Sequence, residues 1–155
     1  MSKLDFLKKN VYKFGAVVPC TQEDIISLER DLKIALPEVY KKFLLICGRA
    51  SGIYLKEDFA HYRYIREIQE FNIEMRGYCK YPPPLKGDLT VLTNYDDGIA
   101  FINVGDVDDP PVYYYDRVSW PPKMAYHSLS ECYLKKLVYF LELESRLTGK
   151  DLHLE

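Results

Sequence analysis

The stretch "YDDGIAFINVGDVDDPPVYYYD", residues 95–116, decides the fold expected for this chain of 155 residues. Two runs rich in β-branched and aromatic residues, 98–104 and 111–116, flank the tract "GDVDDPP". Such runs are typical of strands, whereas glycine, aspartate and proline are turn residues. We therefore expect two strands joined by an acidic loop.

A third strand is expected just before this stretch. "DLTVLTN", residues 88–94, has the same composition, and the turn-forming tetrapeptide "YDDG" separates it from the run 98–104. Short turns between successive strands favour an antiparallel meander. Both alternating sets of side chains in 98–104 are largely apolar, so this strand should be central and covered on both faces.

Helical patterns precede the strands. "TQED", residues 21–24, is a capping box with aspartate in place of glutamate, and Pro37 fits the first position of a second helix that ends at Gly48. A further helix is expected over 61–78, before the prolines of "YPPPL". Between these helices, "GIYL", residues 52–55, is interpreted as a short strand.

The clearest helix follows the strands. "SLSE", residues 128–131, is a capping box, and Gly149 ends the apolar periodicity that it opens. The chain is thus predicted to be a single α+β domain over residues 1–155, with an ordered core of about 12–149 and a small, mainly antiparallel sheet packed with helices. The residues expected on the buried side of the last helix are Leu129, Tyr133, Leu137, Phe140 or Leu141, and Leu147.

The composition is that of a globular protein, with 48% apolar residues, 28% charged residues and a net charge of −2. Basic residues are scattered, so no nucleic-acid stripe is expected, and no apolar run approaches the ~20 residues that cross a bilayer. The first ten residues lack the apolar segment of a signal peptide, which favours a cytoplasmic protein. The four cysteines, Cys20, Cys47, Cys79 and Cys132, are expected to stay reduced.

The first two helices and the acidic stretch together carry a family resemblance. They resemble the SUKH superfamily, which includes bacterial immunity proteins and the Smi/Knr cell-wall regulators of fungi. The chain has Cys47-Gly48-Arg49 where the family often has Asn-Gly-Gly. The helical residues that carry the resemblance are Glu29, Leu32, the pair Leu36-Pro37, Tyr40, Phe43 and Leu44.

The resemblance implies a function as well as a fold. It implies a non-enzymatic immunity protein that neutralises a cognate toxin, such as a basic nuclease, by occluding the active site of the toxin. The alternative is a scaffold or regulatory interaction module of the same fold without a toxin partner, as the fungal relatives suggest. In both cases the partner is a protein, and no cofactor is implied.

The residues themselves specify no catalytic or metal site. A thiol–imidazole dyad would need Cys20 or Cys79 beside His61 or His127, and no local motif supports such a pair. No ligands have the close spacing of a zinc site, and no glycine-rich phosphate loop is present. "DVDD", residues 106–109, could attract calcium but lacks the glycine and glutamate of an EF-hand loop.

The acidic stretch is the predicted partner-binding surface. From residue 88 to 116 the chain has seven aspartates and no lysine or arginine, a distribution that would focus negative potential near the turns. Asp97, beside Gly98, is expected to hold a turn. The alternative interpretation of the whole acidic stretch is that its charges only keep a sheet edge soluble. The residues expected to face the partner are Asp96, Asp106, Asp108 and Asp109, with Tyr113 or Tyr115 as the aromatic anchor.

Overall fold

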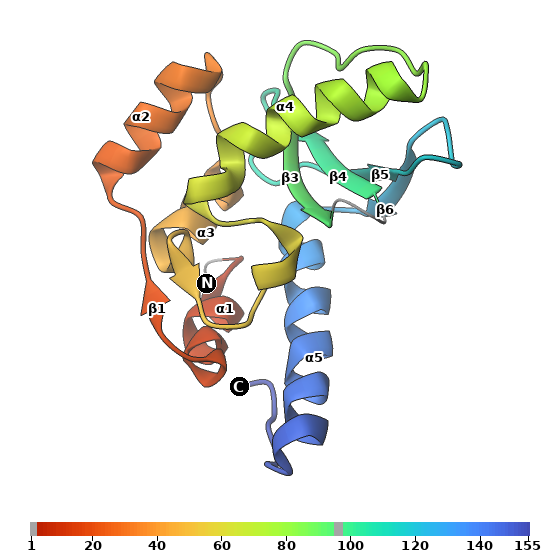
Figure 1. The fold of residues 1–155 in the computed structure, drawn as a ribbon. Helices are drawn as coiled ribbons and strands as arrows, with labels where there is room; N and C mark the ends of the chain where they lie inside the picture. The colour runs from red at the N-terminus through yellow and green to blue at the C-terminus, as the bar shows by residue number, and fades with distance from the viewer. Residues whose placement is uncertain (1–2, 95–97) are drawn as a thin grey trace.

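The computed structural model describes residues 3–94 and 98–155, and it contains α-helices packed around two antiparallel sheets (Figure 1). The predicted α+β class is therefore confirmed. In chain order the elements are α1 (Asp5–Asn10), η1 (Val11–Phe14), β1 (Val17–Val18), α2 (Gln22–Leu32), α3 (Glu38–Cys47), β2 (Ala50–Ser51), η2 (Lys56–Asp58), α4 (Tyr62–Tyr78), β3 (Asp88–Asn94), β4 (Gly98–Asn103), β5 (Val112–Tyr115), β6 (Lys123–Tyr126) and α5 (Leu129–Thr148).

The larger sheet is an antiparallel meander with the strand order β3-β4-β5-β6. Its first three strands match the prediction, and β4 is central with side chains buried on both faces, as its apolar pattern indicated. The fourth strand, β6, was not expected. Its four residues are mostly exposed, so they lack the apolar alternation by which a strand is recognised.

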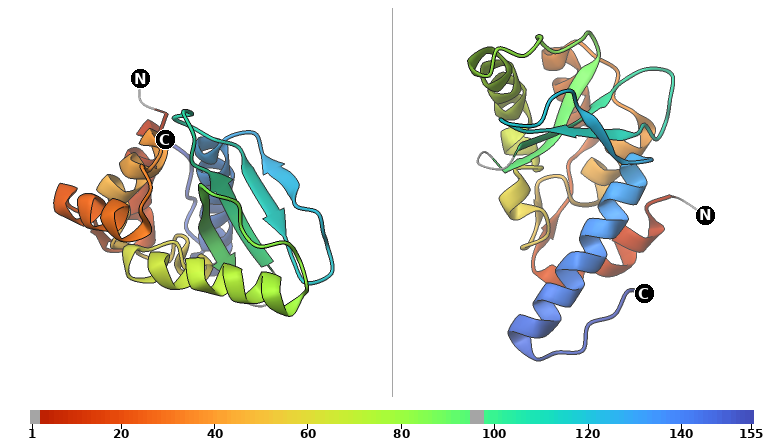
Figure 2. Two further views of the ribbon diagram at one scale, coloured as in Figure 1. Left: turned by 90° about the horizontal axis from the view of Figure 1, so that it is seen from above. Right: turned by 90° about the vertical axis from the view of Figure 1, so that its right-hand side faces the viewer.

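Helices cover the two faces of this sheet (Figure 1). On one face, Met75 of α4 packs against Ile99, Phe101 and Tyr115. At the outer edge of β3, the Gln69 amide of the same helix donates to the Thr90 carbonyl and accepts from the Thr90 N–H, both at 2.8 Å. The other face meets α3 and α5, whose rings Phe43 and Tyr133 stack with centroids 4.4 Å apart. Figure 2 shows the sheet lying between α4 and α5.

The capping box predicted at Thr21 is confirmed at the start of α2, whereas Pro37 is the N-cap of α3 and not its first helical residue. Thr21 Oγ1 accepts from the Asp24 N–H at 3.1 Å, and an Asp24 carboxylate oxygen accepts from the Thr21 N–H at 2.9 Å, which completes the capping box. Gly48 ends α3, but in a right-handed conformation. A side chain there would lie 2.6 Å from Cys20 Sγ, so the glycine serves close packing.

Two expectations for short segments are wrong. The strand predicted over 52–55 lies instead at β2, paired with β1, because the chain turns at Gly52 with φ +63°. Leu147 is 72% exposed, since the last turns of α5 extend beyond the core (Figure 1). The buried side of α5 is Leu129, Cys132, Tyr133, Leu137 and Leu141.

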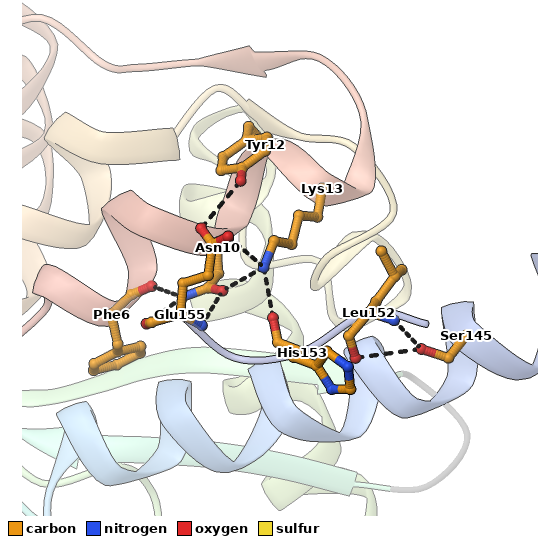
Figure 3. Close-up of polar contacts among 8 residues, drawn as sticks. All are labelled: Phe6, Asn10, Tyr12, Lys13, Ser145, Leu152, His153 and Glu155. Atoms are coloured by element: carbon orange, nitrogen blue, oxygen red, sulfur yellow. Dashed lines mark hydrogen bonds and ion pairs between the residues drawn. The ribbon is translucent and has the colours of Figure 1, made fainter. Parts of the chain in front are cut away.

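The packed part of the chain extends beyond the expected core of about 12–149. Leu4 and Leu7, beside and within α1, are fully buried. Figure 3 shows the last residues folded back against α1: the Asn10 side chain donates to the Glu155 carbonyl at 3.1 Å and accepts from the Glu155 N–H at 2.8 Å. Lys13 donates to the His153 carbonyl at 2.5 Å, so the tail is held by backbone groups. Among the described helices, none has both the length and the apolar character needed to span a bilayer.

Candidate partner-binding surface

The acidic loop, residues 104–111 between β4 and β5, lies against the N-termini of two helices. The Val39 N–H at the start of α3 donates to the Asp108 carbonyl at 3.1 Å. At the start of α5, Ser130 donates to the Asp109 carboxylate through its N–H at 2.9 Å and its hydroxyl at 2.5 Å. Helix N-termini carry unpaired N–H groups and partial positive charge, so the negative loop is stabilised there.

Asp109 therefore does not face a partner, and this part of the prediction is corrected. Its side chain is 5% exposed and also pairs with Lys3 Nζ at 3.3 Å. The sequence could not reveal this role, because Ser130 lies 21 residues further along the chain. Asp109 is a structural residue that joins the loop to α5 and to Lys3, just before α1.

Asp106 and Asp108 remain from the predicted acidic set. Both are exposed, and their carboxylates make no hydrogen bond or ion pair with any residue that the structure describes. Val107 between them is also exposed. Asp96, and the turn predicted at Asp97, lie outside the described residues.

Two further aspartates of the stretch hold local structure. Asp116 accepts from the N–H groups of Val118 and Ser119 at 2.9 and 2.7 Å, and these hydrogen bonds hold the pKa of its carboxyl below the ordinary value. Asp88 accepts from the Leu85 N–H at 2.8 Å. Most described aspartate side chains between residues 88 and 116 thus have an intramolecular role, whereas the carboxylates of Asp106 and Asp108 do not.

The tyrosines of β5 divide as their alternation predicts. Tyr115 is fully buried against α4, where its hydroxyl bonds to the Asn72 side chain, so it cannot act as the aromatic anchor. Tyr113 lies on the same face but is half-buried and reachable. Tyr114 faces the other side of the sheet, beside Ala100 and Tyr126. Of the two predicted anchors, only Tyr113 is accessible.

Tyr113 lines a hollow of about 360 Å³ on the α4 side of the sheet. Asn103, the last residue of β4, also lines this hollow. The hollow therefore lies at the end of the sheet where the acidic loop begins. Apolar and aromatic side chains form most of its walls. We call it the aromatic groove and define it by Phe101, Tyr113, Trp120, Pro82, Pro83 and Leu85.

The groove has a buried arginine beneath it, which the sequence analysis missed. The Arg76 guanidinium lies 5.1 Å from the ring centroids of Phe101 and Tyr115 and 5.3 Å from that of Trp120. Its Nη2 is 3.8 Å from the Asp88 carboxylate, and both side chains are about 5% exposed or less. Aromatic faces and a carboxylate together compensate a charge that would be costly to bury alone. Its place on the buried side of α4, one residue after Met75, is the signal that could have drawn attention to it.

Ser51 and His61 are in contact but are not arranged as a hydrolytic pair. His61 Nε2 lies 2.6 Å from Ser51 Oγ, but both side chains are buried and the serine donates its proton to the Tyr54 carbonyl at 2.5 Å. The histidine must then donate to the serine, which is the reverse of what a general base does. Burial also lowers the pKa of His61.

Of the two thiols considered for a dyad, Cys20 is unsuited to catalysis and Cys79 is half-buried. Burial raises the pKa of Cys20 to about 12, so this thiol stays protonated at neutral pH. All four cysteines are free. Within residues 3–94 and 98–155, no group of three or more histidine, cysteine, aspartate or glutamate side chains could hold a metal ion.

Comparison with known proteins agrees with the resemblance seen in the sequence. The model of the SMI1 / KNR4 family (SUKH-1) matches residues 19–134, which is well over half of the chain. The match begins just before α2 and ends in α5, so it includes the whole acidic loop and the aromatic groove. No curated protein matches the chain. The extent of the family match shows that the chain belongs to the SMI1 / KNR4 family (SUKH-1).

Proposed function

We propose that the protein is a non-enzymatic, immunity-type binding protein that neutralises a cognate toxin by covering its active site. The observation that carries this proposal is the exposure of Asp106 and Asp108, whose carboxylates have no partner among the described residues. Neighbouring aspartates are used within the fold, so these two charges are left for another molecule. Membership of a family that includes immunity proteins supports the same function.

The chemistry of the surface favours a basic partner. Negative charges at the edge of an interface accelerate association with a positive surface and disfavour acidic competitors. The active site of a nuclease is such a surface, because it must hold phosphate groups. We further propose that the protein acts in the cytoplasm, where its free cysteines remain reduced.

The experiment requires a gene that lies beside that of this chain and encodes a toxin domain, and association with that domain is measured by stopped flow at several salt concentrations. The double variant Asp106→Asn/Asp108→Asn is expected to associate more slowly and with a weaker dependence on salt, while its melting temperature stays unchanged. Glu142→Gln, an exposed carboxylate on α5, is the matched control. Wild-type rates in the double variant, or a toxin whose cleavage is not inhibited, would contradict the proposal.

The aromatic groove supports a second candidate, a regulatory interaction module without a toxin partner. A half-buried tyrosine and tryptophan beside prolines are suited to holding a segment of another protein. Co-expression separates the two candidates: an immunity protein rescues cells from the neighbouring toxin, and a regulatory module does not.

A further inference from the structure

The walls of the aromatic groove have the composition of surfaces that bind extended peptides. Tyr113 and Trp120 lie half-buried there, and Pro82, Pro83 and Leu85 are exposed. Trp120 is fixed in place by stacking on Tyr81, with centroids 4.5 Å apart. Rigid aromatic side chains lose little conformational entropy on binding, and proline-rich segments dock into grooves lined by such residues.

The groove also offers hydrogen-bond donors without partners. Neither the indole N–H of Trp120 nor the hydroxyl of Tyr113 donates to any residue in the described part of the chain. A segment in the polyproline II conformation has no internal hydrogen bonds, so its carbonyl groups need donors from the surface that binds it. A helix would bring no free carbonyls to these two groups except at its end.

The buried charge beneath the groove argues against an acidic ligand. Arg76 is already compensated by Asp88 at 3.8 Å and by three aromatic rings. Its Nη2 atom is buried and makes no hydrogen bond with any described residue, and the charge of the guanidinium is balanced by that of Asp88. The base of the groove therefore carries no net charge that would favour an acidic ligand.

The negative charge at one end of the groove would favour a basic residue next to a bound segment. Asn103 also lines the hollow, and Asp106 follows it by three positions, so their Cα atoms are at most about 11 Å apart. Lys86 lies at the same end, because its carbonyl accepts from the Asn103 amide at 3.3 Å. At this end the exposed Asp106 and Asp108 carry two negative charges and Lys86 carries one positive charge, which leaves an excess of one negative charge.

We propose that the aromatic groove binds a proline-containing segment of a protein partner in the polyproline II conformation, with a basic residue at the end nearest the acidic loop. This inference rests on the proposed function as a protein-binding module and names the chemistry of the segment that is bound. Tyr113 and Trp120 pack against the proline rings and donate to the carbonyl groups of the segment. Asp106 and Asp108 attract the basic residue.

Trp120 provides the measurement, because it is the only tryptophan in the chain. Its fluorescence is followed during titration with a peptide of about ten prolines, which spans about 30 Å in this conformation. Three further peptides are titrated: the same peptide flanked by arginine, the same peptide flanked by glutamate, and a glycine–serine peptide of equal length. We expect saturable binding of the proline peptides, with the arginine-flanked form about threefold tighter than the glutamate-flanked form, the size of one exposed ion pair.

Variants locate the binding site. Tyr113→Ala removes the aromatic anchor and is expected to weaken proline-peptide binding by about tenfold or more. Trp120→Phe removes only the indole donor and is expected to weaken binding by less. Binding to both variants is followed by NMR chemical shifts. Tyr139→Ala, an exposed aromatic on α5, is the matched control and should bind as the wild type does. Asp106→Asn/Asp108→Asn should abolish the preference for arginine without affecting the unflanked peptide.

Three results would overturn the inference: no response to any proline peptide at about 1 mM, equal binding of the glycine–serine peptide, or binding unaffected by both groove variants. If the peptides fail while the double aspartate variant still slows toxin association, only the groove inference falls. If the peptides bind and the toxin is not inhibited, the groove inference stands and the immunity function falls.

Discussion

Asp109 and Ser130 join the acidic loop to α5 through two hydrogen bonds, one from the serine N–H at 2.9 Å and one from its hydroxyl at 2.5 Å. The carboxylate is 5% exposed, so it acts within the fold as an additional N-terminal cap for the helix. The aspartates of this stretch therefore differ in their roles. Asp109 stabilises a helix, whereas the side chains of Asp106 and Asp108 remain exposed.

Replacing Asp109 by alanine should lower the free energy of unfolding by about 1–3 kcal/mol, because the half-buried Ser130 donors lose their acceptor. Urea denaturation measures this difference. Asp108→Ala, a neighbouring exposed carboxylate, is the control and should change stability by less than about 0.5 kcal/mol. Equal effects of the two substitutions would show that the contact with Ser130 contributes nothing specific.

Phe43→Ala should cost about 3–5 kcal/mol, since it removes a fully buried ring and leaves a cavity between α3 and α5. The ring stacks on Tyr133 at 4.4 Å, so the loss includes an aromatic contact. Thermal and urea unfolding give the value. A loss below about 1 kcal/mol would be inconsistent with the packing of these two helices.

Asp24 should make stability depend on pH in the acidic range. Arg49 binds its carboxylate at 2.6 and 2.8 Å and lowers the pKa of Asp24 from 3.8 to about 2. The folded pKa lies below the unfolded pKa, so the contribution is complete above about pH 5 and is lost as the pH falls to about 2. The stability difference between wild type and Asp24→Asn should therefore shrink over this range. A constant difference would contradict the shift, and Asp106→Asn is the control carboxylate.

The buried pair of Arg76 and Asp88 should show strong coupling. Asp88→Asn leaves the guanidinium without its carboxylate in a buried site, a loss of about 3–5 kcal/mol. Arg76→Met/Asp88→Asn should recover part of that loss, because the uncompensated charge is gone. A double-mutant cycle in urea measures the coupling, and additive effects would mean that the two side chains do not interact.

Thiol reactivity should separate Cys79 from the other cysteines. Cys20, Cys47 and Cys132 are buried, and burial raises the pKa of each of their thiols. A thiol reagent should modify Cys79 first in the folded protein and all four thiols in denaturant. Cys79→Ser should remove the early phase. Fast modification of two or more sites in the native state would contradict the packing.

Local patterns in the sequence were sufficient for α2 to α5 and for three strands of the meander, but they did not predict α1. The capping box at Thr21 and the turn residues around β4 depend on nearest neighbours, so the chain itself shows them. β6 was not predicted, because its sequence is short and mostly exposed and because it forms a strand through pairing with β5. Tertiary context decides such segments.

The candidate site was predictable only in part for the same reason. Asp106, Asp108 and Tyr113 were identified from composition and are exposed or half-buried, whereas Asp109 and Tyr115 were assigned to the surface and lie in the interior. Arg76 and Trp120, 44 positions apart, meet only in the folded chain. Contacts across such separations leave no local pattern.

The pairing of Gln69 with Thr90 limits how this sheet can associate with others. One side-chain amide from α4 takes the place that a residue of a neighbouring strand would occupy on the outer edge of β3. An incoming chain could pair there only by displacing it, whereas β6 has no such cover among the described residues. Edge-to-edge contact between two molecules through this four-stranded sheet is therefore easier at β6 than at Thr90 of β3. Open-ended growth into fibrils through the sheet needs two free edges, so it would require α4 to leave the edge of β3.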